Sequence, residues 1–339
     1  MKKIWLYCVF PALAMLLLIL DARTAINGAT DGIALSLSSV IPSLFPFLVL
    51  SGILMPMLSN LNIPLLRKIG KAFGIPAGAE SIFFTGLIGG YPIGAQLVSK
   101  AYEQGRLARK DAQRMLGFCS NCGPAFLFGI IGIKFAYSWM PWVLWGIHIF
   151  SAITVAGILP GKSKNSSCLS ISENITWIES LKSAVHTMGF ICGWVILFRM
   201  VLAFLERWIL WILPQELRVF CYGILELSNG CCSLEQIPNT GLRAIICSAM
   251  ISFGGICVAM QTASVCSKIG VGQYVPGKIL QSMISVFSCF LMQYFLLPSG
   301  ERISISPHIF ILLVCILFAA VLIAVKPKIR GRNPVSIGV

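Results

Sequence analysis

The chain has 339 residues, of which 57% are hydrophobic and 11% are charged, and its mean hydropathy is +0.86. A soluble domain carries about 25% charged residues, so this composition excludes a soluble globular protein and indicates one that crosses a membrane several times. The net charge of +14 does not indicate a nucleic-acid-binding protein, because the basic residues cluster between apolar segments and at the C-terminus, as the positive-inside rule expects.

Eight apolar segments are long enough to cross a membrane, at about 20 residues per crossing. They cover residues 4–20, 33–58, 116–133, 142–159, 184–205, 242–266, 279–297 and 309–325. We expect an outer loop at 21–31 and a cytoplasmic loop at 268–278. Lysines and arginines near both ends of the chain place both termini in the cytoplasm.

The segment at 86–94 is apolar but is broken by glycines and a proline. A chain that turns back inside the membrane needs such residues, whereas a simple membrane helix does not. The connector at 100–114 that follows is rich in lysine and arginine, so we expect it to form a short amphipathic helix on the cytoplasmic surface. The first segment is therefore predicted to be a re-entrant hairpin. The next span, 116–133, is itself interrupted by polar residues, glycine and proline at 120–124.

The second half repeats this plan. Residues 220–232 are short, apolar and broken at Ser228-Asn229-Gly230, which predicts a second re-entrant hairpin. The following span, 242–266, is interrupted by serine and glycines at 252–255. The segment at 115–125 also aligns with 250–260. If one hairpin opens from the inside and the other from the outside, the halves form an inverted repeat, as in secondary transporters with a binding site at the midplane.

The predicted fold is thus an all-α polytopic membrane protein with about eight transmembrane helices and two re-entrant hairpins in an inverted repeat. Its predicted parts are a first helix and outer loop (1–32), a first repeat (33–160), a cytoplasmic linker (161–183), a second, inverted repeat (184–298), and a last helix with a basic cytoplasmic tail (299–339).

Residues at the breaks are the candidate substrate ligands, because the N-termini of half-helices favour an anionic ligand at membrane depth. They are Gly89, Gly90, Tyr91, Pro92, Ser120, Asn121, Ser228, Asn229 and Gln261. The alternative is that their side chains only satisfy backbone groups that the breaks set free.

Three ionisable residues near these segments are candidates for function, because a buried charge in a membrane is costly. Glu80 opens the first hairpin and Glu226 lies in the second, so either is a candidate site for a coupling cation or a proton. Each could instead be a structural carboxylate, and Glu80 could lie at the membrane interface. Arg199, within span 184–205, is expected to pair with Glu206, the alternative being contact with an anionic substrate.

Enzymatic and metal chemistry are not indicated. No hydrolase or kinase signature is present, so we predict no catalytic residue and no cofactor. Cys119 and Cys122 form one CxxC without a second pair of ligands, and we interpret them as small residues at a helix break rather than as a metal site. The three histidines, His148 among them, lie near span ends and are expected at the interface.

Three stretches of the chain carry a family resemblance. They are SLSSVIPSLFPFLVLSGIL (36–54), GLIGGYPIGAQLV (86–98) and RMLGFCSNCGPAFLFGIIG (114–132), and they resemble the YlbJ-type sporulation integral membrane proteins. These proteins belong to the nucleoside-recognition, or Gate, domain group, which is similar to the cores of concentrative nucleoside transporters and ferrous-iron permeases. The chain has CSNCGP where a single cysteine followed by Asn-Thr or Asn-Ser is commoner, so the family gives Cys122 no role.

The resemblance implies a protein of the mother-cell-derived outer forespore membrane that moves dipicolinate toward the developing spore. We therefore expect a transporter of a small anionic metabolite, most simply dipicolinate, that works by alternating access. One alternative is a nucleoside or other small-molecule permease of the Gate group. Another is a non-transporting assembly factor for the spore envelope, which would use the connector at 101–113. The expected partners are the substrate, the lipid bilayer, and a second copy of the chain or other sporulation membrane proteins.

Overall fold

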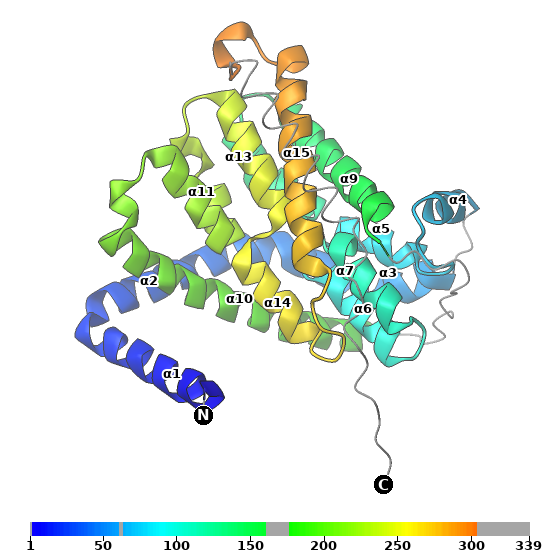
Figure 1. Cartoon of the computed structure of the whole chain (residues 1–339), viewed down its shortest axis with the longest axis horizontal. Helices are drawn as coiled ribbons and strands as arrows, with labels where there is room; N and C mark the ends of the chain where they lie inside the picture. Colours follow the sequence, from blue (N-terminus) through cyan, green and yellow to red (C-terminus); the bar gives the residue numbers. More distant parts are fainter. Residues whose placement is uncertain (1, 61–63, 161–175, 304–339) are drawn as a thin grey trace.

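The computed structural model describes residues 2–60, 64–160 and 176–303, and all regular elements in these ranges are helices (Figure 1). The predicted all-α class is confirmed. Six helical segments in these ranges are long and apolar enough to span a membrane, namely Ala22–Leu54, Arg109–Lys134, Met140–Ile158, Trp177–Trp208, Thr240–Val265 and Tyr274–Leu296. Each of them overlaps one of the eight predicted spans. The predicted last span, 309–325, lies outside the described residues, and α1 contributes the shorter apolar helix Pro11–Leu20.

The two halves of the chain have the same order of elements. In the first half the helices are α1 (Lys2–Leu20), α2 (Ala22–Leu35), α3 (Ile41–Asn60), α4 (Pro64–Ala72), α5 (Glu80–Gly89), α6 (Ile93–Glu103), α7 (Arg109–Cys119), α8 (Pro124–Phe126) and α9 (Met140–Ile158). In the second half they are α10 (Trp177–Trp208), α11 (Gln215–Leu225), α12 (Leu227–Cys232), α13 (Thr240–Phe253), α14 (Gly255–Val265) and α15 (Tyr274–Leu296). Each half therefore runs through a long helical segment, a hairpin (α5–α6 or α11–α12), a broken helix (α7–α8 or α13–α14) and a further long helix.

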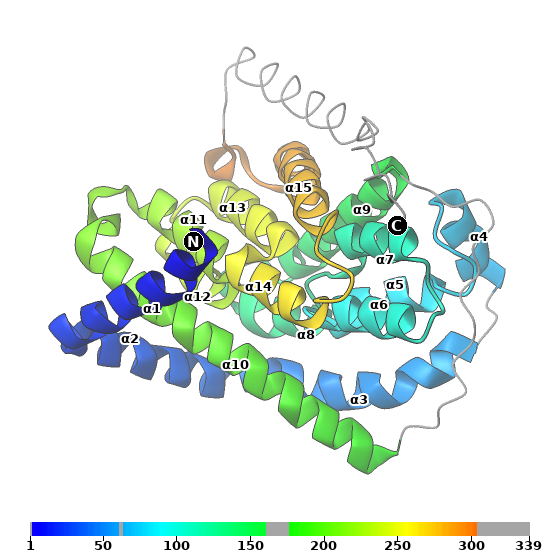
Figure 2. The same cartoon turned by 60° about the horizontal axis from the view of Figure 1, so that its bottom comes forward.

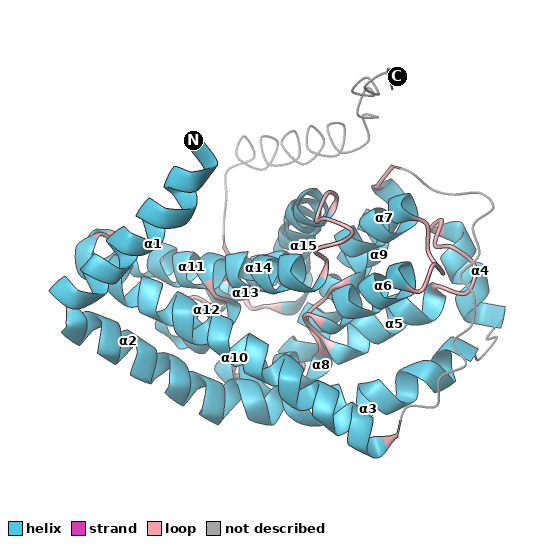
Figure 3. Ribbon diagram, turned by 90° about the horizontal axis from the view of Figure 1, so that it is seen from below, coloured by secondary structure: helices cyan, strands magenta, loops and turns pink. Residues whose placement is uncertain are grey.

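Two layers make up the molecule. The first consists of α2 and α3, joined by the π-helical turn Ser36–Val40, with α10 crossing them diagonally (Figures 2 and 3). The second contains the hairpins, the broken helices, α9 and α15 (Figure 2). Apolar side chains of α3 and α10, such as Leu48 and Met188, form one core between them, and the hydroxyl of Ser180 donates to the carbonyl oxygen of Val49 at 2.6 Å.

The predicted outer loop at 21–31 is wrong, because these residues form most of α2. Their polar side chains, which are typical of a loop, pair with α10 instead. Arg199 lies 2.9 Å from Asp31, and Arg207 lies 3.2 Å from Asp21. Gly28 also lets the two backbones approach, since a Cβ there would lie 2.9 Å from the Cα of Met200.

The predicted surface helix at 100–114 is also wrong. Helix α6 continues to Glu103, and α7 begins at Arg109, so the connector is a turn between two packed helices. Arg114 explains the difference, because its guanidinium is almost fully buried and donates to the carbonyl oxygens of Phe73, Gly74, Leu159 and Ala156. A basic residue that the positive-inside rule assigns to the cytoplasmic surface therefore satisfies free carbonyls inside the protein.

Candidate functional site

Four breaks in the helices, two from each half, lie around the side chain of Tyr91. In the first half, Tyr91 itself lies in the break between α5 and α6, and the break between α7 and α8 spans 120–123. The two breaks touch through glycines, because a Cβ on Gly123 would lie 2.9 Å from the Cα of Gly90. A side chain at Gly123 would force these backbones apart.

The breaks of the second half face the same residue. Gly254 separates α13 from α14 with φ +85°, and a Cβ there would lie 2.9 Å from Cζ of Tyr91. The Tyr91 hydroxyl donates to the carbonyl oxygen of Ile251 at 3.1 Å. Gly255 in turn packs on the second hairpin, since its Cβ would lie 2.9 Å from the carbonyl oxygen of Gly223. The tip of the first hairpin therefore packs directly against the broken helix of the second half.

The second hairpin breaks at Glu226, two residues before the break that the sequence predicts. Glu226 has extended backbone angles and is the N-cap of α12. Its carboxylate accepts hydrogen bonds from the backbone N–H of Ser228 at 3.1 Å and from that of Asn229 at 2.7 Å. The side-chain amide of Asn229 donates to the same carboxylate at 2.8 Å. Ser228 and Asn229 thus form the first turn of α12 rather than a gap in it.

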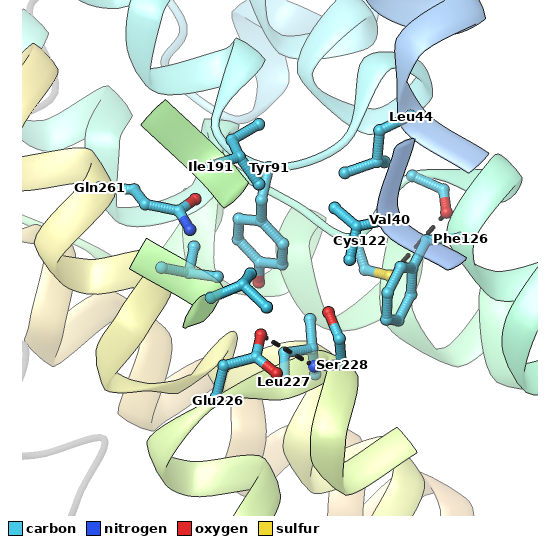
Figure 4. A pocket seen from close by; sticks show the side chains of 13 residues that line it. Val40, Leu44, Tyr91, Cys122, Phe126, Ile191, Glu226, Leu227, Ser228 and Gln261 are labelled. Atoms are coloured by element: carbon cyan, nitrogen blue, oxygen red, sulfur yellow. Dashed lines mark hydrogen bonds between the residues drawn. The ribbon is translucent and has the colours of Figure 1, made fainter. Parts of the chain in front are cut away.

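A small cavity lies beside Tyr91, with a volume of about 30 Å³ (Figure 4). Its wall includes Tyr91, Glu226, Ser228 and Gln261, four of the residues that the sequence singled out. The rest of the wall is Val40, Leu44, Cys122, Gly123, Phe126, Ile191, Val195, Leu227 and Val258. This space is large enough for a water molecule but too small for a metabolite, so a larger molecule can enter only if the surrounding elements move apart.

The remaining predicted residues lie near the cavity in sequence but do not line it. Gly89, Gly90 and Pro92 form the tip that carries Tyr91. Ser120 is fully buried, and its hydroxyl has no hydrogen-bond partner among the described residues. Glu80 is 7% exposed, and its carboxylate accepts from the backbone N–H of Gly78 at 2.6 Å.

Asn121 belongs to a second polar cluster, formed with Lys278 and Gln281 of α15. The Lys278 ammonium donates to Gln281 Oε1 at 2.7 Å and to Asn121 Oδ1 at 3.3 Å, and its Nζ lies 5.2 Å from the centre of the Tyr91 ring. Gln281 Nε2 donates to Asn121 Oδ1 at 3.0 Å. All three polar residues of this cluster have no solvent-exposed surface. Helix α15 begins at Tyr274, so the predicted cytoplasmic loop at 268–278 is wrong for its last five residues.

His148 links the two halves next to this cluster. It lies in the middle of α9 and is fully buried, so its predicted place at the interface is wrong. Its Nε2 accepts from the backbone N–H of Cys122 at 3.1 Å, and its Nδ1 lies 3.1 Å from the hydroxyl of Ser252. A neutral ring that accepts at Nε2 donates from Nδ1, so His148 joins the break before α8 to α13.

One further prediction is confirmed by the structure. Arg199 pairs with Glu206 at 2.9 Å, as predicted, and also with Asp31. Within the described residues, no three or more His, Cys, Asp and Glu side chains gather in a metal-binding arrangement.

Lys278, Gln281 and His148 are the polar residues of this region that the sequence did not single out. A signal was present for two of them, because Lys278 and Gln281 are three residues apart and share one face of a largely apolar helix.

Comparison with known proteins relates the chain to a bacterial membrane protein. No protein-family model and no solved structure matches the chain. The sporulation integral membrane protein YlbJ of Bacillus subtilis (strain 168) is 22% identical to it over 301 residues, which cover 74% of this chain and 72% of that protein. This agrees with the resemblance of the glycine-rich stretches. The chain is therefore a distant homologue of the sporulation integral membrane protein YlbJ.

Proposed function

We propose that this protein is a transporter that acts in sporulation and moves a small anionic metabolite, with dipicolinate as the first substrate to test, across the outer forespore membrane. The observation that carries the proposal is the meeting of four helix breaks, two from each half, at Tyr91. In secondary transporters the substrate site lies between two repeats and is built from broken helices. The glycine contacts between the breaks and the cavity beside them agree with such a site.

The small size of the cavity supports alternating access. A transporter closed on both sides leaves little free space at its site, and here about 30 Å³ remains beside Tyr91. The first hairpin rests on the second half through the contacts of Tyr91 with Ile251 and Gly254. In our proposal, movement of this hairpin away from α13 and α14 opens the site on one side of the membrane. An inverted arrangement of the two halves would let the second hairpin open it on the other side.

Glu226 is the residue we propose for coupling to a proton or a cation. It is 2% exposed, lines the cavity and accepts three hydrogen bonds at the start of α12. Protonation turns one acceptor oxygen into a donor and so weakens the cap of α12. Binding of a proton at the cavity would thereby loosen the tip of the second hairpin. Ser228 and Gln261 are the polar groups we propose for contact with the substrate, because they line the same cavity.

The test is uptake of labelled dipicolinate into liposomes that contain the purified full chain, with a labelled nucleoside and empty liposomes as controls. We expect dipicolinate to accumulate only with the protein present, and faster when a proton gradient is imposed. Uptake of the nucleoside alone would replace our proposal by a nucleoside permease. If correctly folded protein moves neither compound, the result favours an assembly factor, for which changes in the connector at 101–113 should impair sporulation.

A further inference from the structure

Lys278 is a buried lysine in the second turn of α15, a helix long and apolar enough to span a membrane. Its side chain lies in α15 and has no exposed surface. Its ammonium has two hydrogen-bond acceptors in the described part of the chain, the amide oxygens of Asn121 and Gln281, and both are neutral. No carboxylate among these residues forms an ion pair with it. Burying an unpaired charge in a membrane protein is costly, so an uncompensated lysine at this depth is a candidate functional group.

The orientation of both amides is fixed toward Lys278. Asn121 donates from Nδ2 to the carbonyl oxygen of Phe118 at 2.7 Å, which directs its Oδ1 to the ammonium. Gln281 donates from Nε2 to that same Oδ1 at 3.0 Å, which leaves its Oε1 free to accept from Lys278. The two amides therefore hold the ammonium in place without neutralising its charge.

One N–H of the ammonium remains available. A lysine ammonium carries three donors, and two of them are used by Asn121 and Gln281. The ring of Tyr91 also lies close by, with its centre 5.2 Å from Nζ. Tyr91 also lines the cavity, so its ring lies beside both the cavity and Lys278. The Tyr91 ring is therefore one group that lies between the cavity and Lys278.

We propose that Lys278 is the residue that selects an anionic substrate, by donating its free N–H to a carboxylate of the substrate once the Tyr91 ring has moved. This inference rests on the proposed transport function and adds to it the residue that recognises the charge. Asn121 and Gln281 are positioning residues, which hold the ammonium but do not contact the substrate. A substrate carboxylate at this position would form an ion pair with Lys278, for which the described residues supply only neutral acceptors.

A purely structural role for Lys278 makes a different prediction. A neutral amine can also donate to two amide oxygens, and the lysine would then serve only to join α15 to the break before α8. In that case its replacement would lower the stability of the protein without changing its preference for anions. Measuring affinity and stability on the same variants separates the two roles.

The experiment measures binding of labelled dipicolinate to the purified full chain, together with the melting temperature of each variant. Lys278→Gln removes the charge, and Lys278→Arg keeps it. Asn121→Asp places a permanent carboxylate beside the ammonium, where it should compete with the ligand. Lys268→Gln is the control, because Lys268 is exposed and pairs with Glu103 at 3.6 Å, away from the cluster.

We expect Lys278→Gln to raise the dissociation constant about tenfold to a hundredfold, the size of a lost charge-assisted hydrogen bond. Asn121→Asp should raise it similarly. This variant loses the hydrogen bond to the carbonyl oxygen of Phe118, but its new ion pair with Lys278 offsets that loss, so we expect folded protein that decides the question if Lys278→Gln does not fold. Lys278→Arg should bind more tightly than Lys278→Gln, and the control should bind like the wild type.

Wild-type affinity in folded Asn121→Asp and Lys278→Gln would overturn the role of Lys278. If the wild-type protein still took up dipicolinate, the proposed transport function would stand without it. If the folded wild-type protein neither bound nor transported dipicolinate, the proposed function would fail together with this inference.

Discussion

The hydroxyl of Tyr91, at the tip of the first hairpin, donates a hydrogen bond of 3.1 Å to the carbonyl oxygen of Ile251, just before the break between α13 and α14. This bond joins the hairpin tip of one half to the broken helix of the other. Tyr91 is also the residue that lies next to the cavity and next to Lys278. Its side chain therefore connects the parts that would move in the proposed transport cycle.

Tyr91→Phe removes this hydrogen bond and keeps the ring. Because the carbonyl oxygen of Ile251 would lose its side-chain donor, we expect a destabilisation of about 1 kcal/mol, with the contact to Lys278 preserved. Thermal unfolding of the purified protein in detergent measures this change. Tyr294→Phe is the matched control, since Tyr294 donates to Ile303 at the exposed end of α15. Equal melting temperatures for the wild type and Tyr91→Phe would show that the bond does not hold the closed state.

Gly254→Ala should disrupt the contact between the halves. Its φ of +85° disfavours a side chain, and the added Cβ would lie 2.9 Å from the Tyr91 ring. We expect a loss of stability of about 2 kcal/mol or more, from backbone strain and from displacement of Tyr91. Gly189→Ala in α10 is the control, because a Cβ there meets nothing within 4 Å and alanine favours a helix. A fully stable Gly254→Ala protein would contradict the packing described for this break.

Glu226→Gln removes the charge at the cavity and keeps the size of the side chain. We expect folded protein, because the amide oxygen can still accept one of the three hydrogen bonds that cap α12. Uptake should lose its dependence on an imposed proton gradient, which can be measured in liposomes at several external pH values. Glu235→Gln is the control, an exposed carboxylate that pairs with Lys134. A variant that still responds to the gradient like the wild type would remove Glu226 from coupling.

Arg114→Lys tests a structural role away from the cavity. The guanidinium serves four carbonyl oxygens at once, and a lysine has neither the reach nor the number of donors for this arrangement. We expect destabilisation of about 3 kcal/mol, seen as a lower melting temperature and reduced protein in the membrane. Arg109→Lys should be nearly neutral, since Arg109 makes one long bond of 3.4 Å, to the carbonyl oxygen of Ile269. Similar losses in both variants would mean that the buried network is not what stabilises this end of α7.

The sequence predicts most of the breaks at the right place, because several glycines and a proline within one short apolar run weaken a helix there. The tips at 90–92 and 120–123 and the break at Gly254 lie where these residues occur. The predicted break in the second hairpin lies two residues too late. Capping of α12 by the carboxylate of Glu226, rather than the small residues after it, decides where that helix begins. This choice depends on hydrogen bonds that a local pattern does not reveal.

Charged residues account for most of the differences between prediction and structure. The positive-inside rule assigns Lys278 and Arg114 to the cytoplasmic surface, but both are buried, held by amide oxygens in one case and by carbonyl oxygens in the other. Asp21 and Asp31 indicate a loop, but they pair with arginines of α10. In each case a partner lies far away in the sequence. The positive-inside rule counts basic residues in each loop and takes no account of the partners that these residues find inside the protein.

The most direct test of the central claim, that this is a carrier with alternating access, is a counterflow measurement. Liposomes containing the purified protein are preloaded with unlabelled dipicolinate, and entry of a trace of labelled dipicolinate is followed without any ion gradient. Our account predicts a transient accumulation of labelled dipicolinate inside the liposomes, above its equilibrium level. A carrier that takes unlabelled dipicolinate out binds labelled dipicolinate outside and carries it in, and the unlabelled pool inside competes with the label for exit. Label that enters at the same rate with and without preloading, or does not enter at all, would contradict it.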